Sequence, residues 1–148
     1  MRDATGKVIA NLPGHRERVV HCGWHPDSSR VATAGWDGDA RIWGRDGALI
    51  EVVGGHRREV QTAMWSPDGK RFLTTEWSGV AILRDERGTL ATLSGHGGEV
   101  VRASFATNAP LIATCARNGR EVRLWPADDA ELQRWAEALV PEAEPWLD

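Results

Sequence analysis

The chain has 148 residues, of which 41% are apolar and 26% are charged, and its formal net charge is −3. This composition is ordinary for a globular protein and argues against both a disordered chain and a membrane-spanning segment. Two cysteines, Cys22 and Cys115, are too few for a disulfide framework. The first residues lack the apolar run of a secretory signal, so we expect a cytoplasmic protein.

Charge is unevenly divided between the body of the chain and its C-terminal tail. Residues 1–126 carry 17 Lys or Arg against 14 Asp or Glu, whereas residues 127–148 carry 1 against 7. A dedicated nucleic-acid binder needs a strongly basic stripe. The near balance in the body therefore argues against nucleic acid as a partner.

A unit of about 40 residues recurs three times along the chain. Each unit opens on a Gly-His dipeptide and continues with an aromatic residue and a threonine at matching positions. The dipeptides are Gly14-His15, Gly55-His56 and Gly95-His96; the aromatic residues are Trp24, Trp65 and Phe105; the threonines are Thr33, Thr74 and Thr114. This regularity predicts three copies of one structural unit.

Each unit is predicted to hold four short strands separated by tight turns. In the first unit, alternating apolar segments cover residues 19–24, 31–34, 40–43 and 48–53. Pro-Asp and Asp-Gly pairs between such segments supply the backbone angles of tight turns. Residues 7–12 align with 48–53 and should form a strand as well. Because the last repeat strand falls at 122–125, twelve strands are expected.

The pattern resembles the WD-repeat family. The resemblance covers residues 1–126 and rests on the Gly-His dipeptides, the Ser66-Pro67-Asp68-Gly69 turn, the Asp37-Gly38 turn and the closing Trp43. It implies an all-β fold of three four-stranded antiparallel propeller blades. It also implies a protein-binding module rather than an enzyme. We therefore divide the chain into the blades, residues 1–126, and a tail, residues 127–148.

The resemblance further implies a buried hydrogen-bonded chain in each unit, linking the histidine, the threonine, a turn acid and the closing tryptophan. These residues are His15, Thr33, Asp37 and Trp43 in the first unit and His96, Thr114, Asn118 and Trp125 in the third. The second unit keeps His56 and Thr74 but has Ser78 and Arg84 at the other two positions. Buried imidazole, hydroxyl and indole groups each need a partner, so we interpret these residues as structural.

Three blades are too few for a closed ring, since propellers of this kind usually have four to eight blades. The arc would leave two blade faces and a strand edge uncovered. Head-to-tail association of copies would cover them, with residues 7–12 of one copy completing the third blade of its neighbour. A dimer would give six blades and a trimer nine. The other possibility is a segment of a longer propeller.

The tail is predicted to begin with one amphipathic helix. Its apolar residues follow helical spacing, at Leu132, Trp135, Ala136, Leu139 and Val140. Asp128 or Asp129 can cap the start, and Pro141 ends the pattern. We expect the apolar stripe to pack on the propeller. The acidic polar face argues against membrane binding.

The sequence nominates no catalytic, metal or cofactor site. The histidines of the three units fall in separate blades, and His21 and His25 share a strand face but lack a third ligand. Gly95-His96-Gly97-Gly98 lacks the helix and lysine of a phosphate-binding loop. No Gly-x-Ser-x-Gly or His-Glu-x-x-His motif occurs. The chain is therefore predicted not to be an enzyme.

The candidate binding residues lie in the turns just before Asp37, Ser78 and Asn118. These turns hold Trp36, Trp77 and Arg117, residue types that dominate binding hot spots. Arg18, Arg58 and Arg120, with Arg16 and Arg57, should lie near the same rim and suit acidic peptides or phosphates. The alternative is that Trp36 and Trp77 only pack between blades.

Two functions agree with these features. The first is a protein-interaction scaffold that self-assembles into a ring and binds a protein or peptide on its face. The second, by analogy alone, is a sensor segment at the C-terminal end of a larger signalling protein such as a nucleotide-driven ATPase, a kinase or a protease.

Overall fold

The computed structural model describes the backbone of residues 8–117 and 122–138, and the side chains of 133 and 135–138 lie outside this description. Within the described residues, eleven strands form three antiparallel sheets. The first sheet holds β1 (Val19–Trp24), β2 (Arg30–Gly35), β3 (Ala40–Gly44) and β4 (Leu49–Val53). The second holds β5 (Val60–Trp65), β6 (Phe72–Glu76), β7 (Val80–Asp85) and β8 (Gly88–Leu93). The third holds β9 (Val100–Phe105), β10 (Leu111–Ala116) and β11 (Val122–Pro126).

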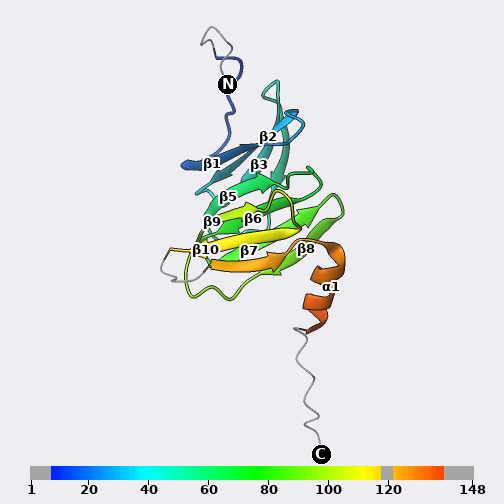
Figure 1. The fold of residues 1–148 in the computed structure, drawn as a ribbon. Coiled ribbons are helices and arrows are strands. Elements are labelled where there is room, and N and C mark those ends of the chain that lie inside the picture. Colours follow the sequence, from blue (N-terminus) through cyan, green and yellow to red (C-terminus); the bar gives the residue numbers. More distant parts are fainter. Residues whose placement is uncertain (1–7, 118–121, 139–148) are drawn as a thin grey trace, which may run out of the picture.

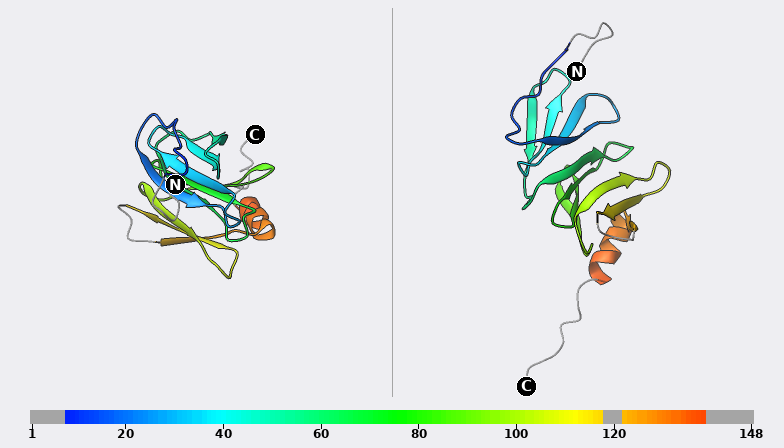
Figure 2. Two further views of the ribbon diagram at one scale, coloured as in Figure 1. Left: turned by 90° about the horizontal axis from the view of Figure 1, so that it is seen from above. Right: turned by 90° about the vertical axis from the view of Figure 1, so that its left-hand side faces the viewer.

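The three sheets lie one upon another as an open stack rather than a closed ring. Consecutive strands pair antiparallel, so each sheet is a meander with its strands in chain order. Figures 1 and 2 show the first sheet at one end of the stack, the second in the middle and the third at the other end. The expected sheets and their antiparallel topology are thus confirmed, apart from the fourth strand of the third sheet.

Residues 7–12 were expected to form a strand that completes the third blade of a neighbouring copy, and in the single chain the described part, residues 8–12, forms no strand. Val8 makes a single bridge and residues 9–12 have no regular structure. The physical reason is that the strand was expected to pair with the β11 edge of a neighbouring copy, and the β11 edge of the same chain lies at the other end of the stack. The third sheet correspondingly ends at β11 with three strands.

The core lies between the sheets, in two separate apolar clusters. The first cluster joins the first and second sheets through Ala32, Ala34, Ala40, Ile42, Val53, Val60, Ala63 and Phe72. The second joins the second sheet to the third and to the helix through Leu73, Ala81, Leu83, Leu93, Ile112, Trp125, Ala127 and Leu132. Alternate residues of a strand point to opposite faces, so the middle sheet contributes to both clusters.

Helix α1 (Asp129–Ala138) follows the last strand and packs on the stack. The Asp128 carboxylate accepts a hydrogen bond from the Glu131 N–H at 2.7 Å, which caps the helix as the sequence indicated. Leu132 is buried in the second cluster. An ion pair of 2.6 Å between Arg71 Nη2 and Asp129 Oδ1 ties the helix start to the second sheet. The expected packing of the tail on the propeller is therefore confirmed for Leu132.

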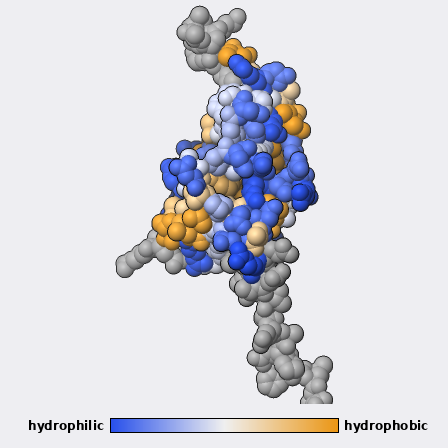
Figure 3. Space-filling model, turned by 45° about the vertical axis from the view of Figure 1, so that its right-hand side comes forward, coloured by the Kyte–Doolittle hydropathy of each residue, from blue (hydrophilic) through white to orange (hydrophobic). Residues whose placement is uncertain are grey.

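Each end sheet leaves one apolar face uncovered. Val19 in the first sheet is 47% exposed, whereas Val60 at the same repeat position in the second sheet is fully buried. Leu124 in the third sheet is 67% exposed, whereas its counterpart Leu83 in the second sheet is fully buried. Figure 3 shows patches of apolar surface on one side of the molecule. The repeat positions that bury apolar side chains inside the stack thus expose them at its ends.

We expect Leu83→Ala to destabilise the fold by about 2–5 kcal/mol, because it removes a fully buried side chain from the second cluster and leaves a cavity. Urea unfolding followed by circular dichroism measures the change. Thr92→Ala, at an exposed position on the outer strand of the same sheet, serves as control and should shift stability by less than about 0.5 kcal/mol. Equal losses from both variants would contradict the assigned core.

Candidate binding face

Three equivalent turns, one per sheet, build the candidate binding face at one end of the strands. Their first residues are Trp36, Trp77 and Arg117. In every case the backbone N–H of this residue donates to the carbonyl three positions after the Gly-His dipeptide, on Arg18, Glu59 and Glu99, with distances of 2.9, 3.0 and 2.8 Å. Because the same bond fixes all three turns, the three side chains emerge at corresponding places of neighbouring sheets.

Glycines allow the two tryptophan turns to close. Gly38 and Gly79 have φ values of +81° and +89°, a region that residues with a side chain rarely adopt. A Cβ atom on Gly79 would also lie 2.9 Å from the Gly98 carbonyl oxygen of the adjacent sheet. The glycine therefore permits both the turn and the close approach of the second and third sheets at this face.

The turn residues and Arg18 form one stacked row across all three sheets. The rings of Trp36 and Trp77 lie 5.6 Å apart, tilted by 57°. The Arg18 guanidinium lies 5.3 Å from the Trp36 ring centre, and that of Arg117 lies 5.5 Å from the Trp77 ring centre. We call Arg18, Trp36, Trp77 and Arg117 the stacked row. Its members attract one another through cation–π contacts at both ends.

The stacked row shows that Trp36 and Trp77 pack on each other and also stay partly exposed. Trp36 and Trp77 do pack across the junction between the first and second sheets, as the packing interpretation required. Trp36 nevertheless keeps 36% of its surface exposed, and Trp77 is partly exposed. An ion pair of 3.2 Å between Arg117 Nε and a Glu99 oxygen holds the far end of the row. The row is thus fixed by its own contacts and still available to a partner.

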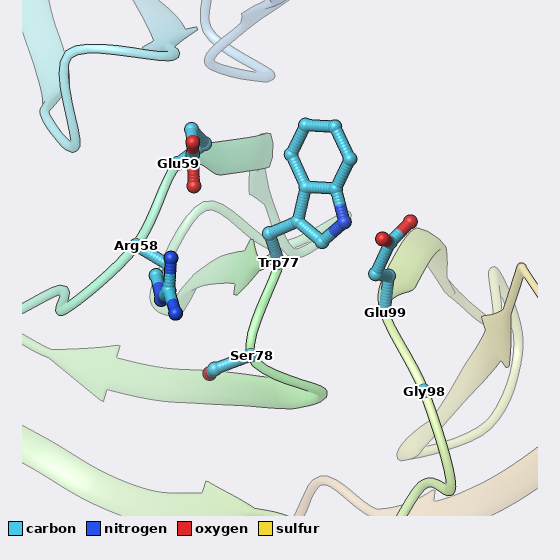
Figure 4. A pocket seen from close by; sticks show the side chains of 6 residues that line it. All are labelled: Arg58, Glu59, Trp77, Ser78, Gly98 and Glu99. Atoms are coloured by element: carbon cyan, nitrogen blue, oxygen red, sulfur yellow. The ribbon is translucent and has the colours of Figure 1, made fainter.

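Two hollows flank the stacked row. The larger, of about 500 Å³, is lined by Arg58, Glu59, Trp77, Ser78, Gly98 and Glu99, and Figure 4 shows the Trp77 ring standing between the two carboxylates. The second, of about 400 Å³, extends from Trp36 to His56. Arg58 lines both. A partner that covers the row could therefore insert side chains beside Trp77 and beside Trp36.

The predicted binding residues are thus brought together, with one exception. Arg18 and Arg58 are exposed at this face, as are the additional rim residues Arg16 and Arg57. Within residues 8–117 and 122–138, neither Arg18 nor Arg58 has an ion-pair partner. Arg120 lies outside the described residues. Positive charge is therefore available for an acidic group.

Beneath the face, the first sheet contains the complete hydrogen-bonded chain expected of it. Asp37 accepts from Nδ1–H of His15 at 3.0 Å, which leaves Nε2 to accept the Thr33 hydroxyl proton at 2.8 Å. The Trp43 indole N–H donates to the same hydroxyl oxygen at 2.9 Å. The backbone N–H of Arg16 also donates to Asp37, at 2.9 Å. The chain thus anchors the turn that carries Trp36 to the centre of the sheet.

Charge around Asp37 is compensated. Burial alone would raise the pKa of this carboxyl, but hydrogen bonds from the Arg16 N–H and from His15 outweigh burial, so its pKa lies below the usual range. Arg41 Nη2 lies 2.9 Å from Asp39 and 3.6 Å from Asp37. Two buried or partly buried carboxylates next to the stacked row are therefore neutralised within the fold.

The second sheet builds the same chain from different residues. His56 Nε2 and Thr74 Oγ1 lie 2.8 Å apart, and Arg84 Nη1 donates to that hydroxyl oxygen at 2.9 Å, where the first sheet uses Trp43. The other Arg84 nitrogen donates to the Gly54 carbonyl at 3.0 Å. Arg84 therefore replaces the closing tryptophan functionally, although the sequence suggested only a departure from the pattern.

Glu76 takes the place of the turn acid in the second sheet. It is buried, and its carboxylate accepts from the Arg57 N–H at 2.9 Å, as Asp37 does from the Arg16 N–H. The Ser78 hydroxyl donates to the other carboxylate oxygen. Sequence reasoning missed Glu76 because it looked for the acid at position 78. The available signal was an acidic residue where the other units have Gly35 and Ala116.

In the third sheet, His96 Nε2 lies 2.6 Å from Thr114 Oγ1, and the Trp125 indole N–H donates to the same oxygen at 2.7 Å. Asn118 lies outside the described residues. The threonine hydroxyl is thus the shared centre of the chain in all three sheets. The residues around this hydroxyl vary, but in every sheet they include a histidine and a hydrogen-bond donor from the third strand.

Within the part of the chain that the structure describes, no group of three or more His, Cys, Asp or Glu side chains could hold a metal ion. His25, considered earlier with His21, instead contacts Asp27 at 2.6 Å and the Gly69 carbonyl at 3.1 Å. None of the described helices is long and apolar enough to cross a membrane.

Comparison with known proteins identifies the repeat. The sequence model of the family described as "WD domain, G-beta repeat" matches residues 6–44 and 87–125, which together exceed half of the chain. The chain belongs to the WD-repeat family. The two matched WD repeats are those that keep the closing tryptophan, and the middle WD repeat, with Arg84 in its place, lies between them.

Solved WD-repeat structures share the fold. The structure of U3-55K has a TM-score of 0.73 at 22% identity, over 78% of this chain and 38% of that chain. The crystal structure of the RRP9 WD40 repeats has the same TM-score at 23% identity, over 78% of this chain and 37% of that chain. Both similarities concern the fold alone, and both chains are more than twice as long as the segment that this WD-repeat chain matches.

Curated relatives match single repeats. Ribosome assembly protein 4 of Chaetomium thermophilum is 41% identical over 46 residues, which is 30% of this chain and 9% of that protein. The probable cytosolic iron-sulfur protein assembly protein Ciao1 of Culex quinquefasciatus is 48% identical over 40 residues, or 27% and 12%. This WD-repeat chain thus spans about a tenth of the length of these relatives.

Acid should weaken the fold through His56 at a higher pH than through Asp37. Burial, and next the Arg84 guanidinium, lower the pKa of His56 below its ordinary 6.5, so the unfolded chain binds the proton more readily than the folded one. The contribution of His56 to the free energy of unfolding is therefore fully present above pH 6.5 and is lost as the pH drops below that value. The pKa of Asp37 lies below 3.8, so its contribution is lost only at lower pH.

We expect His56→Gln to reduce the stability difference between pH 7.5 and pH 5.0, measured by urea unfolding at each pH. His21, whose pKa burial also lowers, supplies the comparison: His21→Gln should remove its own separate share. A His56→Gln variant with the pH dependence of the parent chain would show that His56 does not titrate in this range.

Proposed function

We propose that this WD-repeat chain is a non-enzymatic protein-interaction module whose stacked row and flanking hollows bind an acidic segment of a partner protein. The single observation that carries the proposal is the exposed row of two tryptophans between two arginines, held across three sheets. Large aromatic surfaces next to guanidinium groups are typical of binding hot spots. Arg18 and Arg58 supply the charge for carboxylates.

The proposed ligand is acidic because two carboxylates of the face are already paired with arginines of the fold, while Arg18 and Arg58 are exposed. Glu99 pairs with Arg117, and Asp39 pairs with Arg41. The exposed arginines of the rim add charge at the places where a partner would approach. Arg binds carboxylates in bidentate fashion, which gives orientation as well as attraction. The two hollows then offer room for neighbouring side chains of the ligand.

We expect Trp36→Ala with Trp77→Ala to weaken binding of a fluorescent oligoglutamate peptide by about tenfold or more while leaving the fold intact, because the double variant removes the aromatic centre of the face. Fluorescence anisotropy measures binding, and circular dichroism measures folding. Arg45→Glu, in the exposed turn between β3 and β4 at the other end of the strands, is the control and should bind normally.

Two results would contradict this proposal. Unfolding of the double variant would assign the tryptophans to packing alone. Equal binding of oligoglutamate and of an oligolysine peptide by the parent chain would show that the face does not select acidic groups.

We further propose that copies of the chain associate head to tail into a ring, as a dimer with six blades or a trimer with nine. The support is the exposed apolar surface at both ends of the stack, on Val19 and Trp24 at one end and on Val122 and Leu124 at the other. Within the described residues, the third sheet also has three strands where each of the other two has four. Residues 8–12, which align with that strand, are outside every sheet.

Size-exclusion chromatography with light scattering should give a discrete dimer or trimer for the parent chain, and a folded monomer for Leu124→Lys. The lysine places a charge on a face that association would bury, but the position is exposed in the single chain and so is compatible with folding. Thr92→Lys, on the outer strand of the middle sheet, is the matched control and should assemble. A monodisperse parent monomer would refute self-association.

A further inference from the structure

The two cysteines occupy opposite open faces of the stack, at positions that are apolar and buried inside it. Counting from the aromatic residue that ends the first strand of each repeat, Cys22 corresponds to Ala63. Counting from the central threonine, Cys115 corresponds to Ala34. Ala34 and Ala63 are both fully buried, whereas Cys22 is exposed and Cys115 partly so. Both cysteines are free thiols.

The junction between the first and second sheets shows what these positions do when they are covered. Ala34 on β2 and Ala63 on β5 belong to the same apolar cluster, which fills that junction. The next junction repeats the arrangement, since Thr75 is fully buried on β6 and Ala103 on β9 packs against the second cluster. The chain thus contains two examples of one sheet-on-sheet contact, with small side chains at these positions.

The apolar partners of the same junctions are also duplicated at the open faces. Leu124 and Val122 correspond to Leu83 and Ala81, which bury against the third sheet. Val19 and Trp24 correspond to Val60, which is fully buried, and to Trp65, which packs against the first cluster. The open face of the third sheet therefore carries the same kind of side chains as the face of the second sheet that packs on the third. The open face of the first sheet carries the same kind as the face of the second sheet that packs on the first.

A second copy of this chain can cover both the apolar face of the third sheet and the unpaired edge of β11. Its first sheet presents the face that matches the third sheet, position for position. The same copy carries, just before β1, the segment that aligns with the missing fourth strand, and residues 8–12 of that segment lie in no sheet. One partner thus covers the apolar face and pairs the β11 edge, which would otherwise stay open.

We propose that, where one copy follows another, the third sheet of the first and the first sheet of the second stack in the register of the internal junctions, with Cys115 of one copy beside Cys22 of the next. This inference rests on the proposed self-association and adds its register. The contact is heterologous, because different surfaces of the two copies meet. Each cysteine then faces the other and never its own counterpart.

Cross-linking of single-cysteine variants tests the register. Cys22→Ala retains only Cys115, and Cys115→Ala retains only Cys22; both substitutions introduce the small residue found at the equivalent internal positions. The length of the bismaleimide is set with a reference variant that lacks the native cysteines and carries Ala34→Cys and Ala63→Cys. These two positions lie in the junction between the first and second sheets, so a reagent that links them spans the distance expected between copies. We expect this reagent to give a cross-linked dimer in a mixture of the two variants and none in either variant alone.

The outcomes separate the register from self-association. Assembly of the mixture by light scattering without a cross-linked dimer would overturn the register and leave self-association standing. Cross-linking of one variant with itself would overturn it too, because it requires a symmetric contact. A mixture that stays monomeric at every concentration would refute the proposed self-association itself, and the register with it.

Discussion

The burial of one sheet face against the next is the interaction on which the rest of this structure depends. The middle sheet is covered on both sides, and Leu73 and Leu83 are completely buried there together with Val60 and Ala63. Apolar burial of this kind is the main favourable term in folding. The candidate binding face is a consequence of the same stacking, because Trp36 and Trp77 meet where the first and second sheets pack.

Hydrogen bonds fix how each turn is held against its sheet, which apolar burial alone does not determine. In every sheet a central threonine hydroxyl joins a histidine to a donor on the third strand, which is an indole in two sheets and the Arg84 guanidinium in the middle one. A buried polar group without a partner is costly, so the sheet and its turn are held in one arrangement. Different side chains can meet this requirement, which explains how the middle repeat keeps the geometry with Glu76 and Arg84.

Much of this architecture could be predicted from the sequence because it repeats. Alternation, turn residues and the spacing of Thr33, Thr74 and Thr114 locate eleven strands and the threonine-centred chains. Comparing the three repeats with one another could not reveal two features. It could not show that Arg84 replaces the closing tryptophan and Glu76 the turn acid. Arg84 makes the same hydrogen bond with a different side chain, and Glu76 does so from a different position in the repeat. The comparison also assigned a strand to residues 7–12, which could reach an open β11 edge only in a neighbouring copy, because the β11 edge of the same chain lies at the other end of the stack.

The stacked row illustrates the same limit. The sequence placed Trp36, Trp77 and Arg117 in equivalent turns, but the contact between the two rings depends on the distance between adjacent sheets, which no local pattern encodes. Packing and binding were therefore posed as alternatives, whereas the structure shows the two rings packed on each other and still partly exposed.

The central claim is that the end sheets need a covering neighbour as the middle sheet does. Hydrogen–deuterium exchange over a range of protein concentrations tests it directly, since it reports on each strand separately. We predict that exchange in β1 and in β9 to β11 slows as concentration rises, while exchange in β5 to β7 stays constant. Exchange in the end strands that is independent of concentration, and as slow at high dilution as in the middle sheet, would contradict it.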